Sequence, residues 1–140
     1  CQCIIQRIKM IPKLTPIHLL MERVDLLFVG SELVKYYKLK SKVKFGTYGK
    51  DEGGYNWDTD TIYLNKYYPK VSEFIITILH EIHHAKQIKK YGRKKFIKKY
   101  QQASNMADLD GKDRYWANKW ERKAENWAQQ EYSRKWKNKF

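Results

Sequence analysis

The stretch IITILHEIHHAKQ, residues 75–87, places three histidines and a glutamate directly after an apolar run. Ser72 before it can cap a helix, Glu73 is favourable in a first turn, and Gly92 is a typical stop. The stretch therefore predicts a helix over about residues 72–91. This helix decides the fold, because its polar residues must meet partners from elsewhere in the chain.

His80, Glu81 and His84 fit the pattern H-E-x-x-H. On a helix the two histidines lie roughly 40° apart on one face, so both imidazoles can bind one ion. Glu81 lies on their flank, where a carboxylate can act as a general base on water acidified by Zn²⁺. His83 projects from the opposite flank, and we expect it to support a ligand or the core. The alternative is a core helix that carries surface histidines.

A catalytic zinc site usually takes three protein ligands, and no histidine follows His84. The third ligand must then be an acid, and the segment WERKAENWAQQEY, residues 120–132, offers Glu121 in a lane of alanines. Small residues let two helices approach closely, so we predict Glu121 as the ligand. Glu125, one turn later, can accept a hydrogen bond from a ligand histidine. The open alternatives are a surface salt-bridge helix, or a ligand among Glu125, Asp108, Asp110 and Asp113.

HEIHH, followed 37 residues after His84 by ERKAENWA, resembles the gluzincin metallopeptidases, whose second motif is typically E-x-x-A-D-x-aromatic-A. The order of segments also resembles small single-domain zincins of the ImmA/IrrE kind and phage-encoded putative peptidases. The resemblance covers residues 55–132 and departs at Glu125, where Asp is commoner. It implies that TIYLN, residues 61–65, is an edge strand beside the cleft that could pair with an extended peptide.

The remaining pattern predicts a single α+β, zincin-like domain over residues 1–140, because 140 residues can bury one modest core. We expect an N-terminal helix near residues 16–38 that Gly30 could break. A small sheet of two or three strands should follow, around residues 42–49, 55–57 and 61–65. After the motif helix we expect a basic helix over 93–106, a polar loop at Asp110 and Gly111, and a last helix from about Asp113.

The two cysteines, Cys1 and Cys3, are too close in sequence to form a disulfide framework. No apolar run approaches the roughly 18 to 20 residues that span a bilayer. We therefore expect a protein of the cytoplasm, in a cell or a virus-infected host.

The net charge of +14 is concentrated in residues 86–100, which hold eight basic residues and no acid. Such a block favours anionic partners, so Lys86 to Lys99 could bind nucleic acid or another polyanion. The competing interpretation is the solvated face of an amphipathic helix, since Phe96, Ile97 and Tyr100 follow helical spacing. A chain rich in Lys, Ile, Tyr and Asn can also reflect AT-rich coding alone.

These observations predict a zinc metallopeptidase in which His80, His84 and Glu121 hold Zn²⁺ and Glu81 polarises the water that attacks a polypeptide substrate. The oxyanion needs a further donor, for which Tyr91 and Tyr132 are candidates. The alternative is a catalytically silent zincin-fold protein that works through its basic surface, on nucleic acid or in a viral particle. A peptidase recruited to DNA-bound substrates would combine both.

Overall fold

A computed structural model describes residues 4–8, 23–46 and 51–139. Its four strands form one mixed sheet in the order β1-β3-β4-β2. The strands are β1 (Ile4–Ile8), β2 (Lys42–Phe45), β3 (Asp51–Asn56) and β4 (Thr61–Leu64). β3 is antiparallel to both β1 and β4, whereas β2 is parallel to β4. The α+β prediction is confirmed, and β1 is a strand that the sequence did not predict.

The predicted edge strand at residues 61–65 is wrong. β4 lies inside the sheet, hydrogen-bonded to β3 on one side and to β2 on the other. Ile62 and Leu64 are fully buried, so the strand suits an interior position. No edge of β4 remains for an extended peptide.

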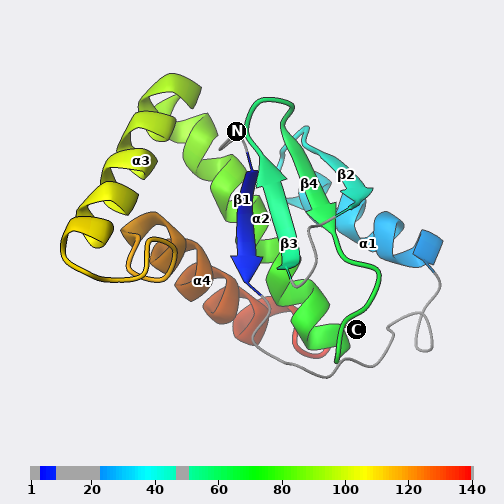
Figure 1. Cartoon of the computed structure of the whole chain (residues 1–140). Coiled ribbons are helices and arrows are strands. Elements are labelled where there is room, and N and C mark those ends of the chain that lie inside the picture. Colours follow the sequence, from blue (N-terminus) through cyan, green and yellow to red (C-terminus); the bar gives the residue numbers. More distant parts are fainter. Residues whose placement is uncertain (1–3, 9–22, 47–50, 140) are drawn as a thin grey trace.

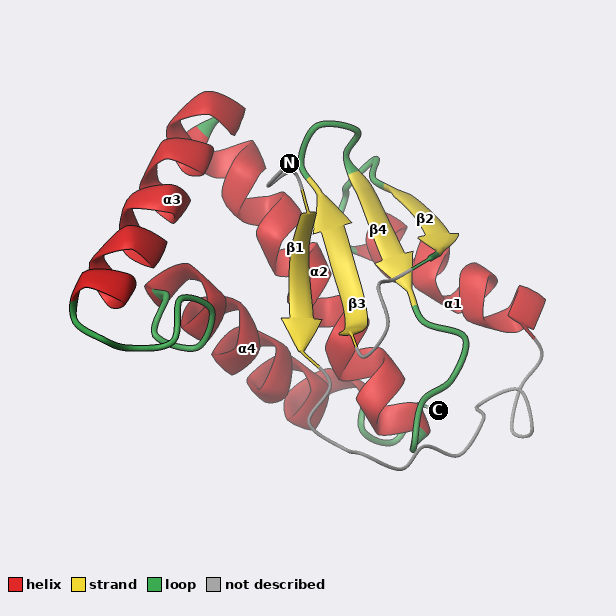
Figure 2. Ribbon diagram, in the orientation of Figure 1, coloured by secondary structure: helices red, strands yellow, loops and turns green. Residues whose placement is uncertain are grey.

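Five helical segments complete the described chain: α1 (Arg23–Tyr36), α2 (Val71–Tyr91), α3 (Arg93–Leu109), α4 (Lys119–Glu131) and the π-helix η2 (Tyr132–Trp136). α2 runs behind the sheet, with α1 on one side and α4 on the other (Figure 2). α3 turns away from the end of α2 and returns toward α4 through residues 110–118 (Figure 1). None of the described helices has the length and apolarity needed to cross a bilayer.

α2 is the central helix because its apolar residues pack on both sides. Phe74, Ile75, Ile78, Leu79 and Ile82 are fully buried, so the helix faces the sheet with one side and other helices with the rest.

The ends of α2 match the sequence prediction in part. The structure places the N-cap at Lys70, without a side-chain cap, so the predicted Ser72 cap is wrong. Glu73 does lie in the first turn, and Gly92 ends the helix with φ of 85°, a conformation that favours glycine. The Gly92 N–H donates to the Ile88 carbonyl oxygen at 2.7 Å.

Glycines set how closely α2 approaches its neighbours. A Cβ at Gly53 of β3 would lie 2.6 Å from Cγ2 of Thr77, and one at Gly30 would lie 2.6 Å from Cδ1 of Ile78. Gly30 does not break its helix, because α1 runs through it from Arg23 to Tyr36. Both glycines bring a neighbouring backbone within reach of the motif helix.

The last helix starts later than the predicted Asp113. The Asp113 carboxylate instead accepts hydrogen bonds from the N–H groups of Tyr115 and Trp116, at 2.9 and 2.8 Å, and so fixes a turn. α4 begins at Lys119, and the Asn118 side chain caps it by accepting from the Trp120 N–H at 2.9 Å. The predicted helix at 93–106 is α3, which extends to Leu109.

Candidate metal centre

Two adjacent helices supply the candidate ligands. His80, Glu81 and His84 lie in the middle of α2, and Glu121 lies in the first turn of α4, which runs beside α2 in Figure 1. The three α2 side chains are fully buried and Glu121 is 1% exposed. The centre therefore lies inside the protein.

The imidazoles of the two motif histidines converge on one carboxylate oxygen. Oε1 of Glu121 lies 2.9 Å from Nε2 of His80 and 2.8 Å from Nε2 of His84. One ligand atom from each of His80, Glu81 and His84 also lies within 4.8 Å of the others. This buried group has the composition and spacing to hold a metal ion.

The other nitrogen of each ring also faces an oxygen. Nδ1 of His80 lies 2.9 Å from Oε1 of Glu125, and Nδ1 of His84 lies 2.9 Å from Oε1 of Gln87. The Gln87 amide nitrogen donates to the Trp120 carbonyl oxygen at 3.3 Å, which leaves its oxygen for the histidine. Each Nδ1 must then donate, because its neighbour can only accept.

A neutral imidazole carries one N–H, so donation from Nδ1 leaves Nε2 of His80 and His84 with a lone pair. Both lone pairs would face a carboxylate oxygen of Glu121, which is unfavourable unless a proton or a metal ion lies between. When no metal ion is bound, a proton on His80 supplies the positive charge that this contact with the carboxylate needs. Burial lowers the pKa of His80, but the contacts with Glu121 and Glu125 outweigh burial and raise it to about 10.

Glu121 is held ionised by the same contacts. Burial raises the pKa of its carboxyl group, while the contacts with His84 and His80 lower it to about 2 overall. A buried carboxylate and two imidazole nitrogens form a donor set of the kind that catalytic zinc uses. Ligand atoms around a tetrahedral zinc ion are about 3.3 Å apart. Oε1 of Glu121 lies 2.9 and 2.8 Å from the two histidine nitrogens, so an ion fits once these distances increase slightly.

Glu81 occupies the flank between the ligands and the sheet. Its Oε1 lies 3.9 Å from Nε2 of His80, which is too far for a hydrogen bond. A Cβ on Gly53 of β3 would contact its Cγ at 3.9 Å. The close approach of β3 therefore limits where the Glu81 carboxylate can turn.

Two tyrosine hydroxyls reach the centre, and the sequence did not single out either. Tyr100 of α3 donates a hydrogen bond to Oε2 of Glu121. Burial, together with the charge and hydrogen bond of Glu121, raises the pKa of Tyr100 and keeps the phenol protonated. The hydroxyl of Tyr115, from the loop before α4, lies 3.4 Å from Nε2 of His80.

Asn118 ties the third ligand to α3. Besides capping α4, its amide nitrogen donates to the Tyr100 carbonyl oxygen at 3.2 Å and to Oγ of Ser104 at 2.9 Å. The segment Asn118 to Glu121 has the N-x-x-E spacing of a capping box, which is the signal that could have located this helix start.

The other sequence candidates lie elsewhere. Tyr91 packs edge-on against Trp120, at 5.6 Å between ring centroids, and Tyr132 follows the end of α4. Among the loop acids, Asp108 pairs with Arg114 at 3.3 Å, Asp110 is the C-cap of α3, and Asp113 holds the turn. The geometry thus favours Glu121 over the aspartates as a ligand.

His83 leaves α2 on the opposite flank. Its ring stacks on Trp127 with centroids 5.1 Å apart. Burial, together with the neighbouring His84 and Lys86, lowers the pKa of His83 to about 3, so the ring is neutral. These contacts give His83 a packing role beside the metal centre.

Comparison of the chain with protein-family models, curated proteins and solved structures found no match.

Proposed function

We propose that the protein is a zinc-dependent metallopeptidase in which His80, His84 and Glu121 hold the ion. The observation that carries the proposal is the convergence of two buried imidazole Nε2 atoms on one oxygen of Glu121. The orienting contacts of Glu125 and Gln87 support it, because ligand histidines commonly donate their second N–H to such oxygens. The resemblance of both motifs to gluzincins points to the same class.

The bound ion would polarise a peptide carbonyl and acidify water. We assign to Glu81 the role of accepting the proton of that water, since its carboxylate lies beside the ligands, with Oε1 3.9 Å from Nε2 of His80. Tyr115 is placed to donate a hydrogen bond to the oxygen on which negative charge develops, because its hydroxyl is near His80. Tyr100 instead holds the Glu121 carboxylate.

One observation favours a second candidate. His80, Glu81 and His84 have no exposed surface and Glu121 has 1%, whereas catalytic zinc needs an open coordination position that water or substrate can reach. In that case the ion would only stabilise the fold, and the protein would be a non-catalytic binding module.

One experiment separates the two candidates. The wild type and Glu81→Gln are loaded with Zn²⁺, their metal content is measured by elemental analysis, and cleavage of a peptide library is followed by mass spectrometry. We expect about one zinc per chain in both, with activity lost in the variant by a factor of roughly 100 to 10,000.

A chelator should abolish wild-type cleavage, and added Zn²⁺ should restore it. A wild type that binds zinc and melts at a lower temperature after chelation, yet cleaves no peptide, would favour the structural ion. Full activity in Glu81→Gln would remove the peptidase proposal.

A further inference from the structure

The end of α2 carries two cationic cavities on different faces. The first, with a volume of about 540 Å³, is lined by Ala85, Ile88 and Lys89 of α2, by residues 38–41 and by the β3–β4 turn. The second, of about 360 Å³, is lined by Lys86, Lys90 and Tyr91 of α2 and by Trp120 and Lys123 of α4. Lysines from segments that are distant in sequence therefore lie around the same two turns of α2.

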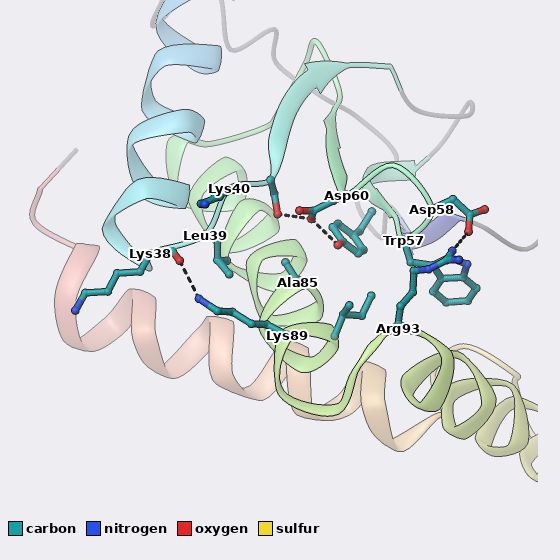
Figure 3. A pocket seen from close by; sticks show the side chains of 12 residues that line it. Lys38, Leu39, Lys40, Trp57, Asp58, Asp60, Ala85, Lys89 and Arg93 are labelled. Atoms are coloured by element: carbon teal, nitrogen blue, oxygen red, sulfur yellow. Dashed lines mark hydrogen bonds and ion pairs between the residues drawn. The ribbon is translucent and has the colours of Figure 1, made fainter.

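The first cavity positions cations without neutralising most of them. Lys89 donates to the backbone carbonyl oxygen of Lys38 at 3.2 Å, and Lys40 extends from the opposite wall (Figure 3). Arg93 is the cation there that pairs with a carboxylate, that of Asp58.

Asp60, the other acid of this cavity, has its Oδ1 occupied by two hydroxyl groups. Ser41 donates to it at 2.5 Å and Tyr55 at 2.6 Å. These hydrogen bonds leave the charge of Asp60 in place, but the cations that line the cavity outnumber its two acids: they are Lys38, Lys40, Lys89 and Arg93. The cavity keeps an excess of positive charge.

The second cavity has no acid in its lining. Lys86 lies over the Trp127 ring at 4.5 Å, Lys90 over Tyr91 at 5.3 Å, and Lys123 over Trp120 at 4.9 Å. Aromatic faces attract cations but leave their charge intact. Three ammonium groups thus surround one concave surface.

α3 extends the positive charge from the first cavity, which its first residue, Arg93, lines. Arg93, Lys94, Lys95 and Lys98 are exposed along it, and the first acid after Glu81 in the chain is Asp108. The large apolar side chains exposed on α3, Met106 and Leu109, lie at its far end. We define the basic surface as both cavities together with the cations of α3 from Arg93 to Lys99.

We propose that the basic surface binds the phosphate backbone of nucleic acid. Its cations spread over α3 and both sides of α2, which suits a polymer of regularly spaced charge better than one small anion. Lysine acts as a point charge that needs no fixed geometry, as sequence-independent phosphate contacts require. A protein partner would need large apolar anchors at the centre of the surface, and the exposed ones lie outside it.

The structure adds residues that a sequence stretch could not include. Lys40 comes from the loop after α1 and Lys123 from α4, and they lie in different cavities. If the whole basic surface binds nucleic acid, Lys40 and Lys123 must each contribute to binding as much as the lysines of α2 do.

The test is fluorescence anisotropy of the full chain with a labelled duplex of about 20 base pairs, at salt concentrations from about 50 to 200 mM. The variant Lys40→Glu with Lys123→Glu is compared with Lys66→Glu with Lys70→Glu. The control pair makes the same charge change at exposed positions near the start of α2, roughly 30 Å from its end.

We expect log Kobs of the wild type to fall linearly with log salt concentration. The Lys40 and Lys123 variant should flatten the slope by about 1.8, as expected for two lost phosphate contacts, and weaken binding at least about 10-fold near 100 mM salt. The control pair should change the slope by much less, and zinc content should stay the same in all three proteins.

Three results would overturn the proposal. They are no binding at the lowest salt, an equal loss in both double variants, or binding to phosphatidylserine vesicles without binding to the duplex. An equal loss in both double variants would mean that binding depends on net charge alone. Binding to the vesicles without binding to the duplex would mean that the partner is a membrane surface.

Discussion

Tyr100 donates a hydrogen bond to Oε2 of Glu121 from the neighbouring helix, so that Oε1 is the oxygen that faces both histidines. This contact makes α3 part of the candidate metal centre although it carries none of the candidate ligands. The phenol fixes which carboxylate oxygen turns inward, and it closes the far side of Glu121 with a donor.

Tyr100→Phe should therefore weaken zinc binding by roughly 10-fold to 100-fold, the usual cost of losing an orienting contact. The measurement is competition with a chromophoric chelator. Tyr91→Phe is the matched control, because that ring packs against Trp120 without contacting a ligand. Equal affinities in the two variants would mean that the Tyr100 hydroxyl has no orienting role.

Substitution of Glu121 should affect zinc binding much more than substitution of Glu125. Glu121→Ala removes the oxygen shared by both imidazoles, so zinc occupancy should fall severely. Glu125→Ala removes only the acceptor for Nδ1 of His80, so affinity should fall roughly 10-fold to 100-fold. Elemental analysis after dialysis measures both. The opposite ranking would exchange the two roles.

His83→Ala should leave zinc bound and most cleavage intact, because the ring stacks on Trp127 away from the ligands. Loss of that stack should lower the free energy of unfolding by about 1 kcal/mol. His84→Ala, one position later, should instead lose the ion. Zinc loss in His83→Ala would show that the wrong histidine pair had been assigned.

Gly53→Ala should lower the free energy of unfolding by about 1–3 kcal/mol, because its Cβ would meet Cγ2 of Thr77 at 2.6 Å. Thr77→Ser removes that methyl group and keeps the hydroxyl that donates to Glu52 at 3.3 Å. The double variant should be more stable than the sum of the single effects predicts. Urea unfolding measures the free energies of unfolding of the wild type, the two single variants and the double variant. Strictly additive changes would show that the methyl group added in Gly53→Ala does not clash with Thr77.

Glu131 should make the free energy of unfolding depend on pH. Burial raises the pKa of its carboxyl group, but hydrogen bonds from Tyr37, at 2.7 Å, and Arg134 help to lower it overall. Because the folded pKa lies below the ordinary value of 4.5, this stabilisation is complete above about pH 4.5. It is lost as the pH falls through the folded pKa.

Glu131→Gln should thus lower the free energy of unfolding by about 1–3 kcal/mol at pH 7, and the difference from the wild type should shrink below pH 4.5. Urea unfolding at both pH values, with chelator present, measures this. Glu32→Gln, an exposed change on α1, should have little effect at either pH. A difference for Glu131→Gln that stays constant with pH would contradict the assignment.

The sequence predicted the elements whose signals are local. The periodic apolar residues of α2 and Gly92 placed the motif helix correctly, and the alanines around Glu121 indicated a helix that packs closely. The start of α4 was placed too early. The Asp113 side chain accepts from the backbone N–H groups of Tyr115 and Trp116, and this turn forms in place of a helix start.

What the sequence could not give depends on contacts between distant segments. β4 reads as a short strand, but its interior position depends on pairing with both β2 and β3. Tyr100 and Tyr115 were two among eleven tyrosines, and only the packing of α3 and of the loop before α4 brings their hydroxyls to the centre. Gln87 was missed because it looks like an ordinary polar residue at the end of a helix.

His80 and Glu121 are 41 positions apart, and this separation has a consequence for biosynthesis. The chain is made from its N-terminus, so both histidines leave the ribosome before the carboxylate that joins them exists. Until α4 emerges, His80 and His84 lack their carboxylate partner, whereas a catalytic zinc site usually takes three protein ligands. Metal loading would then be a late event in the life of each molecule, and a translation product that stops short of α4 would remain without it.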